Sequence, residues 1–520
     1  MAVTSSKQKT IQQVQFILNG GLNYAQSPTE IKDNELRRAD NFIYDPETDY
    51  LITRPGTTYA VNSALPGAIT NMCYYEKTPV LTYLVCASAG NLYYMASPTA
   101  WTLIGALNDS TTIPAFLVFD NKLLIADGGT NIKTWDGVTY STIAGSPAAT
   151  ALSRIKNRVV ANHVSELDSV YLSGPYDALS PETAWDTSGD AIGFKAGYGD
   201  LMTVNAFGVF KSDLIISKKG TWLKNMYRLN TDDSDTTNWY VQEVSHTNCA
   251  QNTQSMCSAW NNVFFVDTNG FKSVLGVETY GDLQVDIVGR KINVLFLSQA
   301  NCDFMTYIPK YNSIWFGMGD RVYCYTEHGS LGSKTDTTTE YFAQNLKPTP
   351  AFTSLQFKQG KIRAIVQVGE IVYLAGNDGW LYKLDESIST DAVGLTTQSY
   401  SSSVRTKTLV PGGDCILKKS QWSLKPKETG VASLLVYTDE VTGTQIKTVN
   451  LTGDGTDLYD ATGYLHDATE YLYDQGAYAY VETSRNRVRG KELAFELMLT
   501  SGRVGIEWIK ADIAMVEGGD

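Results

Sequence analysis

One alternation of apolar and polar positions recurs seven times between about residues 68 and 387. Each time, a short alternating strand leads through a turn to an almost continuously apolar strand, and a second turn leads to a strand with an aromatic or long side chain. Comparable apolar positions lie 36 to 57 residues apart, which fits four-stranded units with variable loops. These positions are Leu84, Leu123, Val159, Leu214, Val263, Ile314 and Ile371.

The strand after each apolar strand follows at an offset of 8 to 11 residues, which is short enough for a tight hairpin. An apolar strand of this kind has both faces covered, as the inner strands of circularly stacked blades do. We therefore predict an all-β fold with a β-propeller of about seven blades over 68–387; six or eight blades fit the same spacing. The matched positions are Leu92, Ile132, Val170, Leu223, Phe271, Val322 and Leu381.

The segments on either side of the repeats predict two further parts. Residues 1–67 form an N-terminal arm with short strands and a short helix over 27–41, where Ser27 and Pro28 give a cap-like start. The polar stretch 386–414 is predicted as a linker. New alternating strands follow it, so 388–520 is predicted as an antiparallel, sandwich-like β-domain. The long polar excursion 328–348 is expected to project from the propeller surface.

The charge balance argues against a protein that grips nucleic acid. The chain has 42 basic and 55 acidic residues, for a formal charge of −13, and it has no basic stripe. The basic runs Lys218–Lys219 and Arg485 to Lys491 are interpreted as solvated strand faces or turns. No apolar run reaches 18 residues, so no membrane span is predicted, and the polar N-terminus contains no secretory signal pattern.

The cysteines predict buried free thiols rather than a disulfide framework. Their number is odd, no CxxC occurs, and several lie in apolar strands, which suits assembly in a reducing cytoplasm. They are Cys73, Cys86, Cys249, Cys257, Cys302, Cys324 and Cys415.

No pattern of catalytic or ligand-binding residues stands out. HExxH, GxSxG and phosphate-binding glycine motifs are missing, and His163, His246, His328 and His466 are far apart. The run 230–238 lacks the glycine and glutamate of a calcium loop and is interpreted as a solvated turn. We therefore predict no enzyme activity, no cofactor and no metal site. Eight tryptophans are assigned to packing between blades rather than to sugar stacking: Trp101, Trp135, Trp185, Trp222, Trp239, Trp260, Trp315 and Trp380.

The segment 20–59 resembles the opening of tail hub or nozzle proteins from short-tailed bacteriophages. The shared features are Asn34–Glu35–Leu36, Asn41 and the strand end Arg54–Pro55–Gly56. The stretches 153–185 and 210–225 are similar to the same family, so the likeness covers about residues 20–300.

The resemblance implies a virion protein that is assembled in the host cytoplasm. Such proteins form a ring, typically six-fold, below the portal and adaptor; they extend the DNA channel and receive fibres or spikes. DNA passes through without specific binding, and an acidic channel wall suits that role because it repels phosphates.

Six arginines are predicted to form interfaces in that assembly: Arg37, Arg38, Arg54, Arg485, Arg487 and Arg489. Two other functions stay open at this point. A carbohydrate-binding or glycan-cleaving propeller predicts tryptophans and carboxylates gathered on one propeller face. A cellular protein-interaction propeller predicts a monomer that forms no ring.

Overall fold

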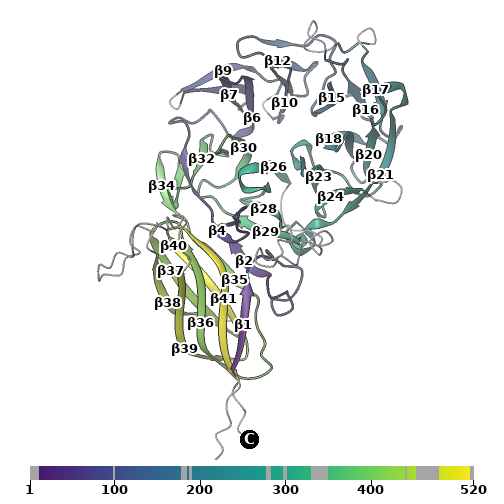
Figure 1. Cartoon of the computed structure of the whole chain (residues 1–520). Helices are drawn as coiled ribbons and strands as arrows, with labels where there is room; N and C mark the ends of the chain where they lie inside the picture. The colour runs from purple at the N-terminus through teal and green to yellow at the C-terminus, as the bar shows by residue number, and fades with distance from the viewer. Residues whose placement is uncertain are drawn as a thin grey trace, which may run out of the picture.

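The protein is almost entirely β-structure (Figure 1). The computed structural model describes residues 11–97, 100–109, 111–176, 184–186, 190–276, 283–296, 301–328, 349–439, 442–451 and 480–515. Within them, helix is limited to α1 (Asn293–Phe296) and to 3-10 turns such as Thr236–Asn238 and Thr253–Ser255. The predicted excursion 328–348 lies outside the described residues except for His328, which ends a strand.

Seven four-stranded antiparallel units form a closed propeller, which confirms the predicted fold class. The first strands of successive blades lie next to one another around the ring, and the first strand of blade 7 returns to that of blade 1. Blade 1 consists of β6 (Ile69–Thr78), β7 (Leu81–Ser88), β8 (Asn91–Ser97) and β9 (Ala100–Ala106), and blade 2 of β10 (Ala115–Phe119), β11 (Lys122–Ala126), β12 (Lys133–Trp135) and β13 (Tyr140–Thr142). Blade 3 consists of β14 (Leu152–Ile155), β15 (Arg158–Asn162), β16 (Ser169–Leu172) and β17 (Ile192–Lys195), blade 4 of β18 (Thr203–Phe210), β19 (Asp213–Lys219), β20 (Lys224–Asn230) and β21 (Tyr240–Ser245), and blade 5 of β22 (Met256–Ala259), β23 (Asn262–Asp267), β24 (Gly270–Gly276) and β25 (Leu283–Asp286). Blade 6 consists of β26 (Cys302–Ile308), β27 (Ser313–Met318), β28 (Arg321–His328) and β29 (Thr349–Leu355), and blade 7 of β30 (Ile362–Val368), β31 (Ile371–Gly376), β32 (Leu381–Asp385) and β5 (Gly56–Tyr59).

The predicted apolar strands are the second strands of the seven blades. Their marker residues are buried, as are those of the third strands, with two exceptions. Ile371 is half-exposed because it lies at the turn that begins β31, and Leu223 is exposed because it lies in the turn before β20. Neighbouring blades cover both faces of these strands, which explains why the sequence pattern is continuous rather than alternating.

Buried polar side chains at the ends of second strands hold the segments that enter the first three blades. The Ser88 hydroxyl accepts a hydrogen bond from the backbone N–H of Gly67, and the Asp127 carboxylate accepts one from Asn108. The side-chain oxygen of Asn162 accepts hydrogen bonds from the backbone N–H groups of Thr150 and Ala151. These polar residues interrupt the apolar pattern because a buried backbone donor without a partner is costly.

The N-terminal strand β5 closes the ring. It pairs with β32 and supplies the outer strand of blade 7, although more than 300 residues separate the two along the chain. The strand pair β33 (Thr390–Val393) and β34 (Thr396–Ser399) extends the same sheet. The segment 386–414, predicted as a linker, thus contains two strands that extend the sheet of blade 7 and a third, β35 (Ser402–Thr406), that enters the next domain.

The second domain is a two-sheet sandwich that shares a sheet with blade 6 (Figure 1). One sheet runs from β29 through β2 and β35 to β40, β37 and β38. The other has the order β3-β4-β41-β36-β39, with β1 also paired to β41. The strands not yet defined are β1 (Ile11–Ile17), β2 (Leu36–Asp40), β3 (Phe42–Tyr44), β4 (Leu51–Thr53), β36 (Cys415–Pro426), β37 (Gly430–Thr438), β38 (Thr442–Leu451), β39 (Tyr480–Gly490), β40 (Leu493–Ser501) and β41 (Val504–Met515).

The helix predicted over 27–41 is absent. The backbone makes a single turn at Ser27–Ile31, and β2 begins at Leu36. Between them the buried Glu35 carboxylate accepts hydrogen bonds from the backbone of Lys32 and the side chain of Asn23. Pairing of β2 between β29 and β35 outweighs the weak helical pattern.

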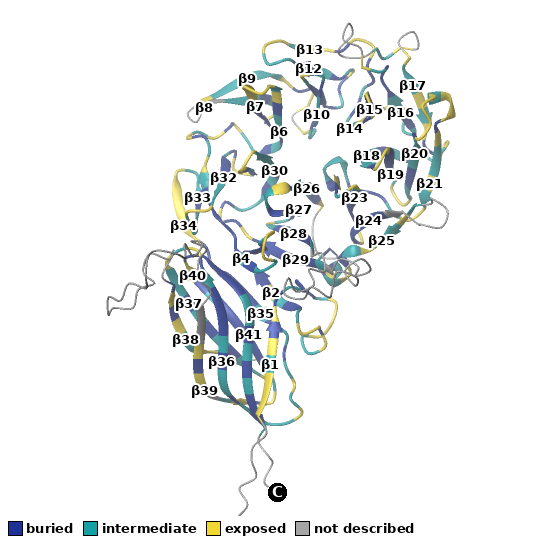
Figure 2. Ribbon diagram, viewed as in Figure 1, coloured by how far each residue is buried: buried dark blue, intermediate teal, exposed yellow. Residues whose placement is uncertain are grey.

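The two domains share one hydrophobic core. A single cluster of buried side chains joins Trp422 and Phe495 of the sandwich to Phe271 and Phe316 of blades 5 and 6. Figure 2 shows burial concentrated inside the blades and between the two sandwich sheets, with exposure on outer strands such as β34. Propeller and sandwich therefore form one continuous body.

Candidate functional site

Arg54, predicted as an interface residue, lies inside the protein. It follows β4 of the sandwich and precedes β5 of the propeller, and it is 0% exposed. Its guanidinium donates to both carboxylate oxygens of Asp391 at 2.8 and 2.6 Å. The prediction for Arg54 is wrong, because a fully buried side chain is not available to another subunit.

The remaining contacts of Arg54 form a junction between the two domains. Its Nε donates to Asn41 Oδ1 at 3.0 Å, and the guanidinium carbon lies 3.7 Å from the ring centre of Tyr400. Asn41 in turn donates to the carbonyl of Ser401 and accepts from the backbone of Gln356. We call Asn41, Arg54, Asp391 and Tyr400 the junction cluster.

Gly56 is required by the backbone packing beside this cluster. A Cβ at this position would lie 2.3 Å from the carbonyl oxygen of Thr390 and 2.7 Å from that of Ile388. The Asn41 and Arg54–Pro55–Gly56 elements, on which the family resemblance depends, therefore have a structural role: they hold β5 against β33 and bind the sandwich to the propeller.

The other predicted interface arginines lie in two separate places. Arg37 and Arg38 are on β2, where Arg38 is half-exposed and pairs with the buried Glu496 at 3.2 Å. Arg485 and Arg489 are exposed on β39, in the other sheet, and Arg489 pairs with Asp414 at 2.6 Å. The side chain of Arg487 lies outside the described residues. The structure thus does not bring the six arginines together.

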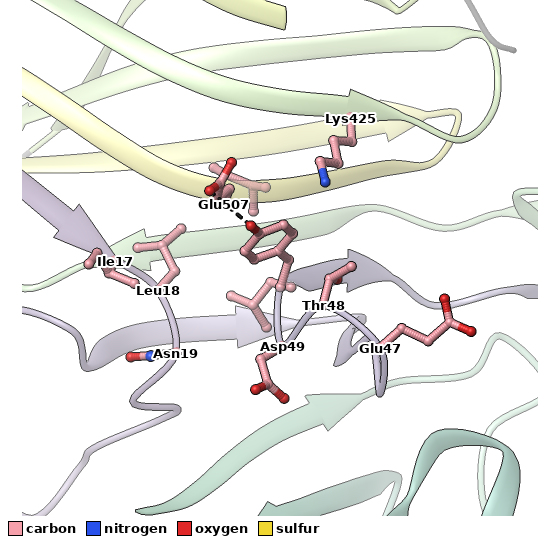
Figure 3. A pocket seen from close by; sticks show the side chains of 11 residues that line it. Ile17, Leu18, Asn19, Glu47, Thr48, Asp49, Lys425 and Glu507 are labelled. Carbon is pink, nitrogen blue, oxygen red and sulfur yellow. Dashed lines mark hydrogen bonds between the residues drawn. The ribbon is translucent and has the colours of Figure 1, made fainter. Parts of the chain in front are cut away.

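A groove opens on the sandwich where β1 ends and β4 begins along β41 (Figure 3). Its volume is about 440 Å³, and charged groups line it. Glu507 accepts hydrogen bonds from Tyr50 and Ser423, each at 3.0 Å, and Lys425 lies over the Tyr50 ring. Burial and the bond to Glu507 raise the pKa of Tyr50. Both Glu507 oxygens are engaged, and Glu47 and Asp49 also line the groove.

The histidines and the acidic turn have local structural roles. His163 Nδ1 accepts from the backbone of Ser165 and Glu166 at 3.1 Å, as expected of a histidine at a loop edge. The run 230–238 forms a turn in which Asp233 and Asp235 accept backbone hydrogen bonds. His466 lies outside the described residues. Among the residues that are described, no group of three or more His, Cys, Asp or Glu could hold a metal ion.

All seven cysteines are free thiols, which confirms that part of the prediction. Five are buried as predicted, whereas Cys73 and Cys257 are partly exposed residues, although burial of their thiol groups raises the pKa of both to about 12. In the described part of the chain no helix is long and apolar enough to cross a membrane.

The predicted environments of Lys218 and Trp222 are also wrong. Lys218, predicted on a solvated face, is fully buried and donates to Ala196 O and to Asp200. Trp222, predicted to pack between blades, is 92% exposed, whereas Trp135, Trp239 and Trp315 are buried as expected. The sequence does carry a signal for Trp222, since a KKG turn ends the apolar strand just before it.

Asp267 links blades 4 and 5 and should make stability depend on pH. It is 0% exposed and accepts from Lys224 at 2.6 Å and from Lys272 at 2.7 Å. Burial acts to raise the pKa of Asp267, but the hydrogen bonds from the two lysines outweigh it and lower the pKa.

A carboxylate with a lowered pKa stabilises the fold fully above its unfolded value, about 3.9. This stabilisation is lost as the pH falls through the lower folded value. We expect Asp267→Asn to reduce the melting temperature at pH 7, and the difference from the wild type to shrink as the pH falls below about 4. Thermal melts between pH 7 and 3 measure this, with the exposed Glu370→Gln as control. A constant difference across that range would contradict the assignment.

The sequence matches no protein-family model and no curated protein. Solved structures similar to this chain include virginiamycin B lyase from Staphylococcus aureus, at 12% identity over 63% of this chain and 97% of that one, with a TM-score of 0.41. BamB from Moraxella catarrhalis matches at 12% identity over 72% and 97% of the chains, with a TM-score of 0.36. The Dos1 propeller matches at 11% over 71% and 93%, with a TM-score of 0.37.

Proposed function

We propose that this chain is a structural subunit of the tail of a short-tailed bacteriophage and has no enzyme activity. Copies form a ring, six-fold as in the family that the sequence resembles, below the portal and adaptor. The ring extends the DNA channel and receives fibres or spikes.

The observation that carries this proposal is the junction cluster. Two of the motif elements that resemble tail hub proteins, Asn41 and Arg54–Pro55–Gly56, join propeller and sandwich through the buried Arg54–Asp391 pair and the Asn41 bridge. A rigid two-domain body suits a part that must transmit load and hold its shape in a particle. In the sandwich groove Glu507 is held by Tyr50 and Ser423, and among the described residues no group of three or more metal-ligating side chains occurs, which favours a structural role over catalysis.

The propeller pore itself is not the proposed DNA channel. Among the seven first strands, Glu76 and Asp303 are the acidic residues, and Lys361 and Arg363 pair with Asp303. The channel belongs to the ring of subunits. We expect that reversing acids which line that channel to lysine slows genome ejection, because lysine would bind phosphates and release counterions.

An in vitro ejection assay measures that rate, with the same number of acids reversed on the outer surface as control. An ejection rate that stays unchanged would count against an acidic channel wall.

For the assignment as a whole, electron microscopy of the chain mixed with portal–adaptor complexes should show rings on the adaptor. Monomers that bind neither partner would overturn it.

One observation favours glycan binding as a second candidate function. Trp222 and Tyr198 are 92% and 89% exposed, and Trp222 directly follows Thr221, which lines a shallow polar pocket of about 500 Å³ together with Thr203, Asn205 and Asn252. Exposed aromatic rings next to hydroxyl and amide groups can stack on sugars. A glycan array separates the two functions: binding that is lost in Trp222→Ala, with no ring formation, would support this candidate.

A further inference from the structure

Four apolar side chains gather on one face of the propeller at blade 4. Tyr198, Leu201, Trp222 and Leu223 are 89%, 84%, 92% and 59% exposed, and we call them the blade-4 patch. The first two lie in the connection from β17 to β18, the others in the turn from β19 to β20. Connections between blades and turns between second and third strands emerge on the same face. A soluble surface rarely exposes so many large apolar groups together without a partner.

The blade-4 patch is held rigidly. The buried Lys218 donates to Ala196 O at 2.5 Å and to Asp200 at 2.7 Å, which fixes the loop that carries Tyr198 and Leu201. The second loop is closed by the backbone bond from Gly220 to Leu223 at 2.9 Å. Little conformational entropy would therefore be lost on binding, which favours affinity.

A second apolar set lies on the opposite face, at blades 1, 2 and 7. Val80, Leu81, Val138 and Ile371 are 94%, 41%, 85% and 41% exposed, and we call them the blade-1 patch. They lie in the turns β6–β7, β12–β13 and β30–β31, which join first to second or third to fourth strands and emerge on the other face. In Figure 1, β6 and β30 lie across the ring from β20 and β21.

We propose that the blade-4 patch of one copy binds the blade-1 patch of the next copy, with Trp222 as the anchor. This inference rests on the proposed function and names the surfaces that build its ring. The patches differ and lie on opposite faces, so the contact is heterologous. A growing oligomer leaves one patch of each kind free at its two ends, so addition continues, and the oligomer closes into a ring when the rotation between neighbouring copies divides a full turn.

The size and chemistry of the patches suit a second copy of this chain. Two nearly free aromatic rings with two leucines offer a few hundred Å² of apolar surface, since an aromatic side chain buries about 150–250 Å². That area matches the apolar centre of an interface that covers about 800 Å² on each partner. Leu201 and Leu223 favour an apolar protein surface over a sugar, and the blade-1 patch supplies one.

Two double variants test the pairing. Leu201→Asp/Trp222→Asp removes the blade-4 patch, and Val80→Asp/Val138→Asp removes the blade-1 patch; Leu395→Asp, at a 62% exposed leucine, is the matched control. We expect each double variant to associate at least about 30-fold more weakly than the wild type, as loss of a hot spot does. Melting curves should stay unchanged because the substituted residues are exposed.

Mixing gives the sharper result. Each double variant retains one intact patch, so an equal mixture should form heterodimers and nothing larger, which native mass spectrometry resolves. Self-association of either variant at the wild-type level, a mixture that stays monomeric, or a wild type that stays monomeric up to its solubility limit would each overturn the proposal.

The outcomes also separate this inference from the proposed function. Rings of the double variants on the portal–adaptor complex would overturn the patch contact and leave the tail assignment intact. Wild-type oligomers that depend on both patches but bind no portal–adaptor complex would support the patch contact and overturn the tail assignment.

Discussion

Replacing Arg54 with methionine is expected to reduce the free energy of unfolding by about 3–5 kcal/mol, the range for removing one partner of a buried ion pair. The Asp391 carboxylate would remain buried at 0% exposure without the two guanidinium bonds at 2.8 and 2.6 Å. Asn41 and the Tyr400 ring would also lose their contacts with the cation. Chemical denaturation followed by circular dichroism measures the loss.

Two further variants make this result specific. Arg489→Met removes an exposed arginine that pairs with the partly exposed Asp414, and it should cost about 1 kcal/mol or less, as surface pairs do. Arg54→Met/Asp391→Leu removes both buried charges and should recover part of the stability, because neither charge remains unpaired. Equal losses for Arg54→Met and Arg489→Met would contradict the role given to the junction cluster.

Removing residues 1–59 is expected to prevent the remaining chain from reaching a stable fold. The deletion takes away β5, which closes blade 7, and β1, which pairs with β41 from Ile11 to Ile17. It also removes the fully buried Phe16, Leu36 and Phe42. At about 1.5–3 kcal/mol for each such side chain, these three alone contribute about 4.5–9 kcal/mol, which is comparable with the 5–15 kcal/mol that stabilises a typical protein.

Limited proteolysis and the yield of soluble protein measure this effect. A peptide of residues 11–59 supplied in trans should restore protease resistance, because its strands can pair again with β32 and β41, whereas a scrambled peptide should not. A truncated chain as resistant as the full one would show that the segment is a dispensable arm.

The seven blades could be predicted because their second strands are buried on both faces. Val263 and Ile314 illustrate this: each lies in a run of apolar residues, and each is fully buried in the structure. Local turn chemistry then fixes the distance to the next strand, as for Val263 and Phe271 in β23 and β24. Such signals are local, so a single sequence shows them.

The closure of the ring could not be predicted in the same way. β5 has four residues, Gly56–Tyr59, and pairs with a strand more than 300 residues away, so no local pattern marks it. Arg54 looks like any exposed arginine until the fold brings Asp391 to it. The strands β33 and β34 lie at a sheet edge, where β34 is exposed along its whole length. Their sequence is therefore polar, and a polar stretch of this kind predicts a linker.

The exposed apolar patches could not be predicted from the sequence either. Trp222 belongs to a set of tryptophans spread through the repeats, and other members of that set, such as Trp135 and Trp315, are buried. The sequence does not distinguish a tryptophan in a blade from one in a turn unless the turn is placed correctly. The burial of Lys218 could not be predicted for a related reason: its partners, Ala196 O and Asp200, come from the preceding interblade loop.

Cryo-electron microscopy of the full chain, alone and mixed with portal–adaptor complexes, tests the central claim most directly. We predict a closed six-fold ring on the adaptor, each subunit showing a seven-bladed lobe fixed to its sandwich in one orientation. Isolated monomers in both samples, or lobes that vary in orientation relative to their sandwiches, would contradict it.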